Sequence, residues 1–136
     1  MMTVLLWLLV GLVLGGACVA PVFWMSDRAA RLSVLLAVVS MNSIYIGVAL
    51  NSPIHVLGFE LLLAVVLCGV AYALQRLRSP WIGLMVLAHA GVDGLHHLID
   101  AAPVPEWYIL ACLSFDGIFA ALATIRLLRP RSPSAA

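Results

Sequence analysis

The chain has 136 residues, of which 65% are hydrophobic and 10% are charged. A soluble domain is usually about half apolar and about a quarter charged, so this composition excludes an ordinary soluble protein. The net charge of +1 gives no reason to expect nucleic acid as a partner. A membrane-spanning helix needs about 20 mainly apolar residues, and the sequence has room for five such segments and no separate soluble domain.

Five apolar segments follow one another, with short polar breaks between them. The expected spans are 3–25, 30–50, 53–75, 80–101 and 105–128. Because unpaired backbone groups cost several kcal/mol each in lipid, the spans are predicted to be helices. Residues 1–128 are therefore expected to form one all-α domain, an integral membrane bundle of five transmembrane helices surrounded by the lipid bilayer. Residues 129–136 are expected to form a short disordered cytoplasmic tail.

The basic residues predict an orientation. All are arginines, and they occur between the first and second spans, between the third and fourth, and at the end of the fifth or after it: Arg28, Arg31, Arg76, Arg78, Arg126, Arg129 and Arg131. With five spans, these three places lie on the same side of the membrane. The positive-inside rule then puts the N-terminus outside and the C-terminus in the cytoplasm of a multi-pass protein of the cell membrane.

Polar residues inside the spans mark a possible site. Charges there cost about 2.5–3.5 kcal/mol each, yet Glu60, Asp93 and Asp116 lie within three different spans. A helix rises about 1.5 Å per residue, which puts these acids roughly 10–17 Å from the outer end of their helices. On the second span, Asn42 and Tyr45 lie at about 12 and 8 Å. The polar groups therefore meet in the middle and outer half of the membrane.

The stretch "LAHAGVDGLHHLIDA" in the fourth span carries three of the four histidines. At about 100° per residue, His89, Asp93, His96 and Asp100 fall within an arc of about 60°, and His97 widens the arc to roughly 100°. This stripe can face the bundle interior, where the acids of the third and fifth spans would meet it. Gly91 and Gly94, on other faces, are expected to allow close helix packing.

One interpretation of the stripe is a metal site. Imidazole and carboxylate groups together suit Zn, Fe or Mn. The expected ligands of this divalent metal share the bundle interior: His89, Asp93, His96, Glu60 and Asp116. Bundle-core di-iron proteins pair a Glu-x-x-His helix motif with facing carboxylates, and Asp93-x-x-His96 is an analogue that occurs once in this chain.

A second interpretation is acid–base chemistry without a metal. An Asp–His pair in a dry pocket can move a proton on an apolar, lipid-like substrate dissolved in the membrane. The candidate catalytic groups are the three acids and one imidazole: Asp93, His89, Glu60 and Asp116. Three further residues are expected to support them by hydrogen bonds or packing: Asn42, Tyr45 and His97.

Two other classes stay open. Chains of Asp, Glu and His also mark the paths of proton or metal-ion transporters. A non-enzymatic helical subunit, or an assembly protein of a membrane complex, would use the cluster to fix helix register. Gly11 and Gly15 form a GxxxG pair that would let another helix approach in a homo-oligomer or a partner subunit. The cysteines, Cys18, Cys68 and Cys112, lie in apolar runs and are expected to be buried small hydrophobes.

The nonapeptide "HAGVDGLHH" resembles a pattern, H-[GA]-x-x-D-x-x-H-H, found in short uncharacterised polytopic membrane proteins. The resemblance covers one helix, with Asp116 on the next helix as a further match. It implies that the pattern acts as a unit and carries no established activity. The part "DGLHH" is also similar to one histidine box of membrane desaturases, but four histidines are too few for that family's di-iron centre.

Overall fold

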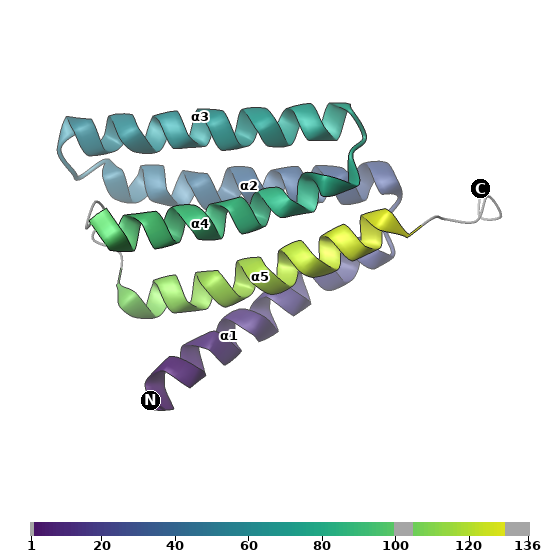
Figure 1. Cartoon of the computed structure of the whole chain (residues 1–136), viewed down its shortest axis with the longest axis horizontal. Coiled ribbons are helices and arrows are strands. Elements are labelled where there is room, and N and C mark those ends of the chain that lie inside the picture. The colour runs from purple at the N-terminus through teal and green to yellow at the C-terminus, as the bar shows by residue number, and fades with distance from the viewer. Residues whose placement is uncertain (1, 100–104, 130–136) are drawn as a thin grey trace.

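The structure is a computed structural model, and it describes residues 2–99 and 105–129, without the side chains of 97–99 and 106. The predicted tail at 130–136, Asp100 and the side chain of His97 lie outside the described residues. The helices in chain order are α1 (Met2–Val19), η1 (Ala20–Phe23), α2 (Asp27–Ala49), α3 (Ile54–Arg76), η2 (Pro80–Gly83), α4 (Leu84–Ile99) and α5 (Glu106–Leu128). The predicted all-α class with five long helices is confirmed for these residues (Figure 1).

Four of the helical segments are long and apolar enough to cross a membrane: Met2–Phe23, Asp27–Ala49, Ile54–Arg76 and Trp107–Leu128. The fourth predicted span differs from them. It begins with the 3-10 turn η2, and its α-helical part, α4, has 16 described residues. At about 1.5 Å per residue this part is about 24 Å long, which is shorter than a bilayer core of roughly 30 Å.

Local capping explains where the helices begin. The Ser26 hydroxyl accepts a hydrogen bond from the Ala29 N–H at 3.3 Å, so α2 starts at Asp27, earlier than the apolar run indicated. The Ser79 hydroxyl accepts from the Trp81 N–H at 3.2 Å, with Pro80 in the first turn, so η2 begins directly after this cap. Pro53 precedes α3 with an extended ψ of 148°, so the helix begins at Ile54.

The end of α3 is a Schellman motif. The Ser79 N–H donates to the Leu74 carbonyl at 2.9 Å, and the Arg78 N–H donates to the Gln75 carbonyl at 3.1 Å. Arg78 has a φ of 55°, the left-handed conformation that glycine usually supplies at this position. An arginine therefore holds a backbone position that costs about 1–2 kcal/mol for a residue with a Cβ atom.

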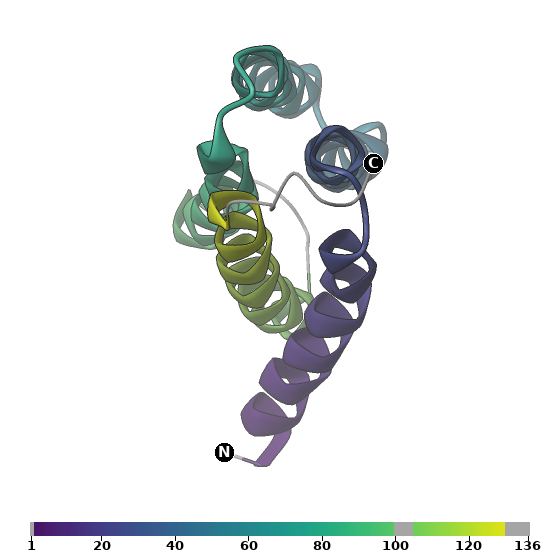
Figure 2. The ribbon, with the colours of Figure 1, turned by 90° about the vertical axis from the view of Figure 1, so that its right-hand side faces the viewer.

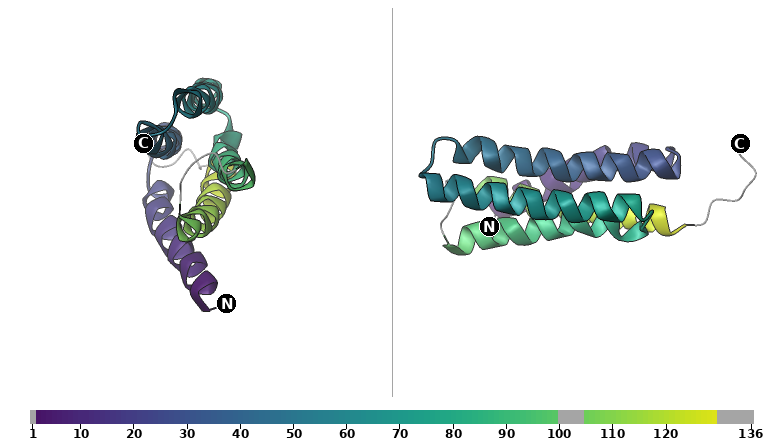
Figure 3. Two further views of the ribbon diagram at one scale, coloured as in Figure 1. Left: turned by 90° about the vertical axis from the view of Figure 1, so that its left-hand side faces the viewer. Right: turned by 90° about the horizontal axis from the view of Figure 1, so that it is seen from above.

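The helices pack side by side, with successive helices running in opposite directions (Figure 1). Helix α5 lies between α4 and α1, and α3 packs on α2. Seen from above, the axes of α2, α3 and α4 are nearly aligned, although the chain direction alternates (Figure 3, right). The view along the bundle shows α1 inclined away from them (Figure 2).

The close approach of α1 and α5 depends on glycine. A Cβ atom at Gly11 would lie 2.0 Å from the Ala111 carbonyl oxygen, and one at Gly15 would lie 2.7 Å from the Phe115 carbonyl oxygen. Gly11 and Gly15 of the GxxxG pair therefore allow the close approach of α5 of the same chain. The packing role expected of Gly91 and Gly94 is wrong, because both are exposed and a Cβ at either would meet nothing within 4 Å.

The apolar core occupies the half of the bundle that contains the arginines. Val19, Val34, Val38, Ile82 and Val86 are fully buried there. At the same end the side chain of Arg126, 4% exposed, donates to the Met25 carbonyl oxygen at 2.7 Å and to the Asp27 carboxylate at 3.0 Å. The buried acids and histidines gather in the other half, as the depth estimates indicated.

Candidate functional site

Helix α4 turns its histidine stripe inward. His89, Asp93 and His96 are 2%, 0% and 2% exposed, while Leu87 and Leu95 of the same helix face outward. The spacing i, i+4, i+7 puts the three polar side chains on one face of the helix. Apolar residues on the opposite face suit contact with lipid.

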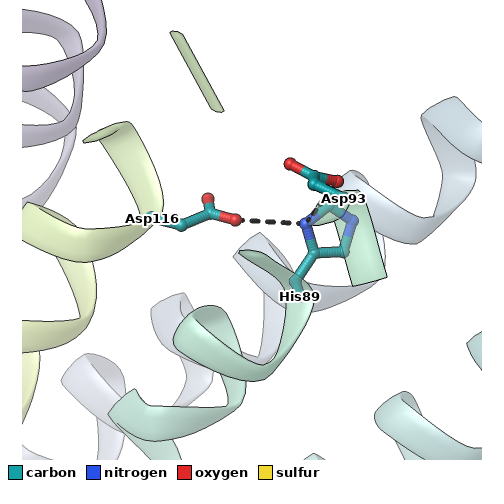
Figure 4. A group of neighbouring side chains, drawn as sticks. All are labelled: His89, Asp93 and Asp116. Atoms are coloured by element: carbon teal, nitrogen blue, oxygen red, sulfur yellow. Dashed lines mark hydrogen bonds and ion pairs between the residues drawn. The ribbon is translucent and has the colours of Figure 1, made fainter. Parts of the chain in front are cut away.

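His89 lies between two carboxylates (Figure 4). Its Nδ1 atom is 3.2 Å from Oδ2 of Asp116 on α5 and 3.7 Å from Oδ1 of Asp93 on α4. These three residues are all buried, and each offers one ligand atom within 4.8 Å of the other two. The group can therefore either hold a metal ion or share protons between one imidazole and two carboxylates.

His96 belongs to a separate pair. Its Nε2 atom lies 2.5 Å from Oε1 of Glu60 on α3, and both side chains are nearly inaccessible. Neither residue is in the group that could hold a metal. The five residues expected in one site are thus divided between the group of His89, Asp93 and Asp116 and the pair of His96 and Glu60.

Tyr45 on α2 joins the group and the pair. Its hydroxyl donates to Oδ1 of Asp93 at 2.5 Å. Its ring stacks on the His96 imidazole, with centroids 4.6 Å apart, and meets the His89 imidazole edge-on at 5.5 Å. Asn42, expected to play a similar part, instead bonds to the Val38 carbonyl of its own helix at 2.8 Å. His97, the other expected supporting residue, has no described side chain.

Three buried polar atoms at the site have no hydrogen-bond partner among the residues that the structure describes: Nε2 of His89, Oδ2 of Asp93 and Nδ1 of His96. A buried polar atom without a partner costs about 1–3 kcal/mol, and such atoms are rare in folded proteins. Their concentration in one place indicates a site that a further molecule or ion would complete.

An apolar cavity of about 340 Å³ lies against this group. Side chains of α1, α2, α4 and α5 form its wall, including Met41, Phe115 and Phe119, and the His89 and Asp116 side chains reach it. The cavity therefore brings a dry, mostly hydrocarbon space into contact with an ionisable pair. Such a combination is typical of sites for small apolar ligands.

The cavity wall contains residues that the sequence interpretation did not assign to the site. Tyr108 and Cys112 both line it. They precede Asp116 by eight and four residues, so the i, i+4, i+8 spacing along one helical face was the signal for them. Cys18 also lines the cavity, and its expected burial is wrong, because it is exposed.

The fold and the site together define a class. The chain is a multi-pass helical membrane protein with a buried cluster formed by one histidine and two aspartates. No model of a known protein family, no curated protein and no solved structure matches it.

Proposed function

We propose that this protein is a membrane enzyme that binds a divalent metal ion through His89, Asp93 and Asp116 and acts on an apolar substrate dissolved in the bilayer. The observation that carries the proposal is the convergence of these three side chains, from two helices, beside an apolar cavity. The ion would be Zn, Fe or Mn, since one imidazole and two carboxylates suit these metals.

The distances support a metal ion. A tetrahedral ion with ligands at 2.0–2.2 Å separates neighbouring ligand atoms by about 3.3–3.6 Å. The two separations from Nδ1 of His89, 3.2 and 3.7 Å, lie just outside that range, by about 0.1 Å each. Three protein ligands would leave a fourth position for water or substrate, which is the arrangement of catalytic rather than structural zinc sites. Tyr45 would orient the Asp93 ligand through its hydrogen bond.

A metal-free form of the same proposal assigns different roles to the same atoms. If the His89 Nδ1–H donates to Asp116, then Nε2 carries the lone pair and can act as a base, since no described residue forms a hydrogen bond with it. The pair of His96 and Glu60 would hold a further proton on the other side of Tyr45. The metal content of the protein distinguishes the two forms.

The arginines support the orientation in this proposal. With the arginine end in the cytoplasm, as the positive-inside rule predicts, η2 and α4 together form the fourth of five spans and the N-terminus lies outside. The site then faces the outer half of the cell membrane. The transporter alternative has less support, because the apolar core fills the half of the bundle through which a continuous path would have to pass.

The test is metal content by mass spectrometry of the purified protein and two matched variants. His89→Ala removes a proposed ligand, whereas His96→Ala removes an equally buried histidine of the same helix that lies outside the group. We expect a stoichiometric metal ion in the parent and in His96→Ala, and none in His89→Ala. No metal in the parent after reloading with Zn, Fe or Mn would refute the metal form. Equal loss in both variants would refute the assigned ligand set.

A further inference from the structure

A second cavity lies at the other end of the bundle, among the arginines. Its volume is about 610 Å³, and it is lined by Arg28 and Arg31 of α2, Gln75 and Arg76 of α3, and Arg78 of the following turn. Small-molecule sites usually occupy about 300–1,000 Å³. This cavity is therefore large enough for a ligand and has a strongly basic wall.

No acidic side chain of the described residues lines this cavity. The described acidic side chain next to it is Asp27, which is bound by Arg126, and Arg126 does not line the cavity. Arg28, Arg76 and Arg78 are exposed, so solvent weakens the repulsion among the four guanidinium groups, and a ligand with several negative charges would reduce what remains. The guanidinium fork matches the spacing of phosphate oxygens, so a phosphate group fits this set of donors better than a single carboxylate would.

Arg78 gives an independent reason to regard the wall as a binding site. It occupies the left-handed position of the Schellman motif, where glycine would complete the same turn without strain. The strained residue nevertheless contributes a fourth charge to the cavity. Strained backbone positions of this kind concentrate at sites that bind ligands. The positive-inside rule accounts for arginines on one side of the membrane, but it does not require them to line a common cavity.

We propose that the cavity of Arg28, Arg31, Arg76 and Arg78 binds a phosphate-bearing ligand with at least two negative charges. Its source is either a soluble diphosphate or the phosphate head group of an anionic lipid. This inference is independent of the proposed metal site, because it uses the opposite end of α2 and of α3 and none of the residues of that site.

The test measures binding to the full chain in neutral detergent and in nanodiscs. Inorganic diphosphate is titrated at constant ionic strength, and phosphatidylcholine nanodiscs with and without phosphatidic acid provide the lipid arm. Arg31→Gln and Arg76→Gln should each weaken binding at least tenfold. Arg129→Gln, which removes an equal charge from an exposed position outside the cavity, should weaken it less than twofold.

The outcomes separate the two sources. Binding of diphosphate identifies a soluble ligand, and binding of phosphatidic acid alone identifies a lipid. Arg78→Gly guards against a misfolded variant, because it should raise the unfolding temperature and weaken binding at the same time. Failure of both probes to bind the parent protein, or equal weakening by Arg129→Gln, would overturn the proposal.

Discussion

The packing of α1 on α5 makes a sharp prediction for Gly11→Ala. The new Cβ atom would lie 2.0 Å from the Ala111 carbonyl oxygen and 2.2 Å from the Ser114 hydroxyl oxygen. Ordinary contacts begin near 3.4 Å, so α1 must move away from the α5 backbone by the difference, about 1.4 Å. Such overpacking typically costs about 1–3 kcal/mol. Because Cys18 on α1 lines the apolar cavity, the same movement of α1 would widen the cavity.

The assay is thermal unfolding in detergent, with Gly16→Ala as the matched control. A Cβ at Gly16 meets nothing within 4 Å, and alanine is the better helix former by about 1 kcal/mol. We expect Gly11→Ala to lower the unfolding temperature by several degrees and Gly16→Ala to leave it unchanged or slightly higher. Equal unfolding temperatures for the two variants would show that α1 does not rest on α5 at Gly11.

Three further substitutions test the site and the arginine end. Tyr45→Phe leaves the buried Asp93 carboxylate without its hydroxyl donor and should reduce stability by about 1–3 kcal/mol, measured by chemical unfolding; no loss would mean that the bond is not formed. Asp27→Asn removes the charged partner of the buried Arg126 and should lower the unfolding temperature most at low salt; an effect independent of salt would contradict an ion pair. Arg78→Gly should gain about 1 kcal/mol by relieving the left-handed strain, and a lower unfolding temperature would contradict that reasoning.

The helices were predictable because hydropathy alone marks segments that must satisfy their backbone groups in lipid. Hydropathy is less accurate for the residues at which the helices begin and end. The second apolar run was placed at 30–50, but α2 begins at Asp27, because a serine cap and polar first turn continue the helix beyond the apolar region. The fourth run was expected as one span, yet it divides into the 3-10 turn η2 and the shorter helix α4. The pattern of apolar residues does not show where 3-10 hydrogen bonding changes to α-helical hydrogen bonding.

The inward stripe of α4 was also predictable, since it needs only the angle of 100° per residue within one helix. The partners of the stripe were not, because they depend on the packing of other helices. Depth along the spans placed Glu60 and Asp116 in the correct half of the bundle. Depth does not say from which side of α4 another helix approaches. The third helix approaches α4 on the side of His96, and the fifth approaches it on the side of His89.

The division of the cluster gives the two ends of the stripe different chemistry. Oε1 of Glu60 is 2.5 Å from the His96 imidazole, so this pair already satisfies much of its own polarity. His89 has a looser geometry, with two carboxylates at 3.2 and 3.7 Å and an unpaired Nε2 atom, and it borders the apolar cavity. Two buried atoms lack a described partner at the His89 end, Nε2 of His89 and Oδ2 of Asp93, and one lacks it at the His96 end, Nδ1 of His96. A ligand gains most where it satisfies such atoms. Under the proposed function, a metal ion or a substrate would therefore bind at the His89 end, which borders the cavity, and the His96 end would hold a proton.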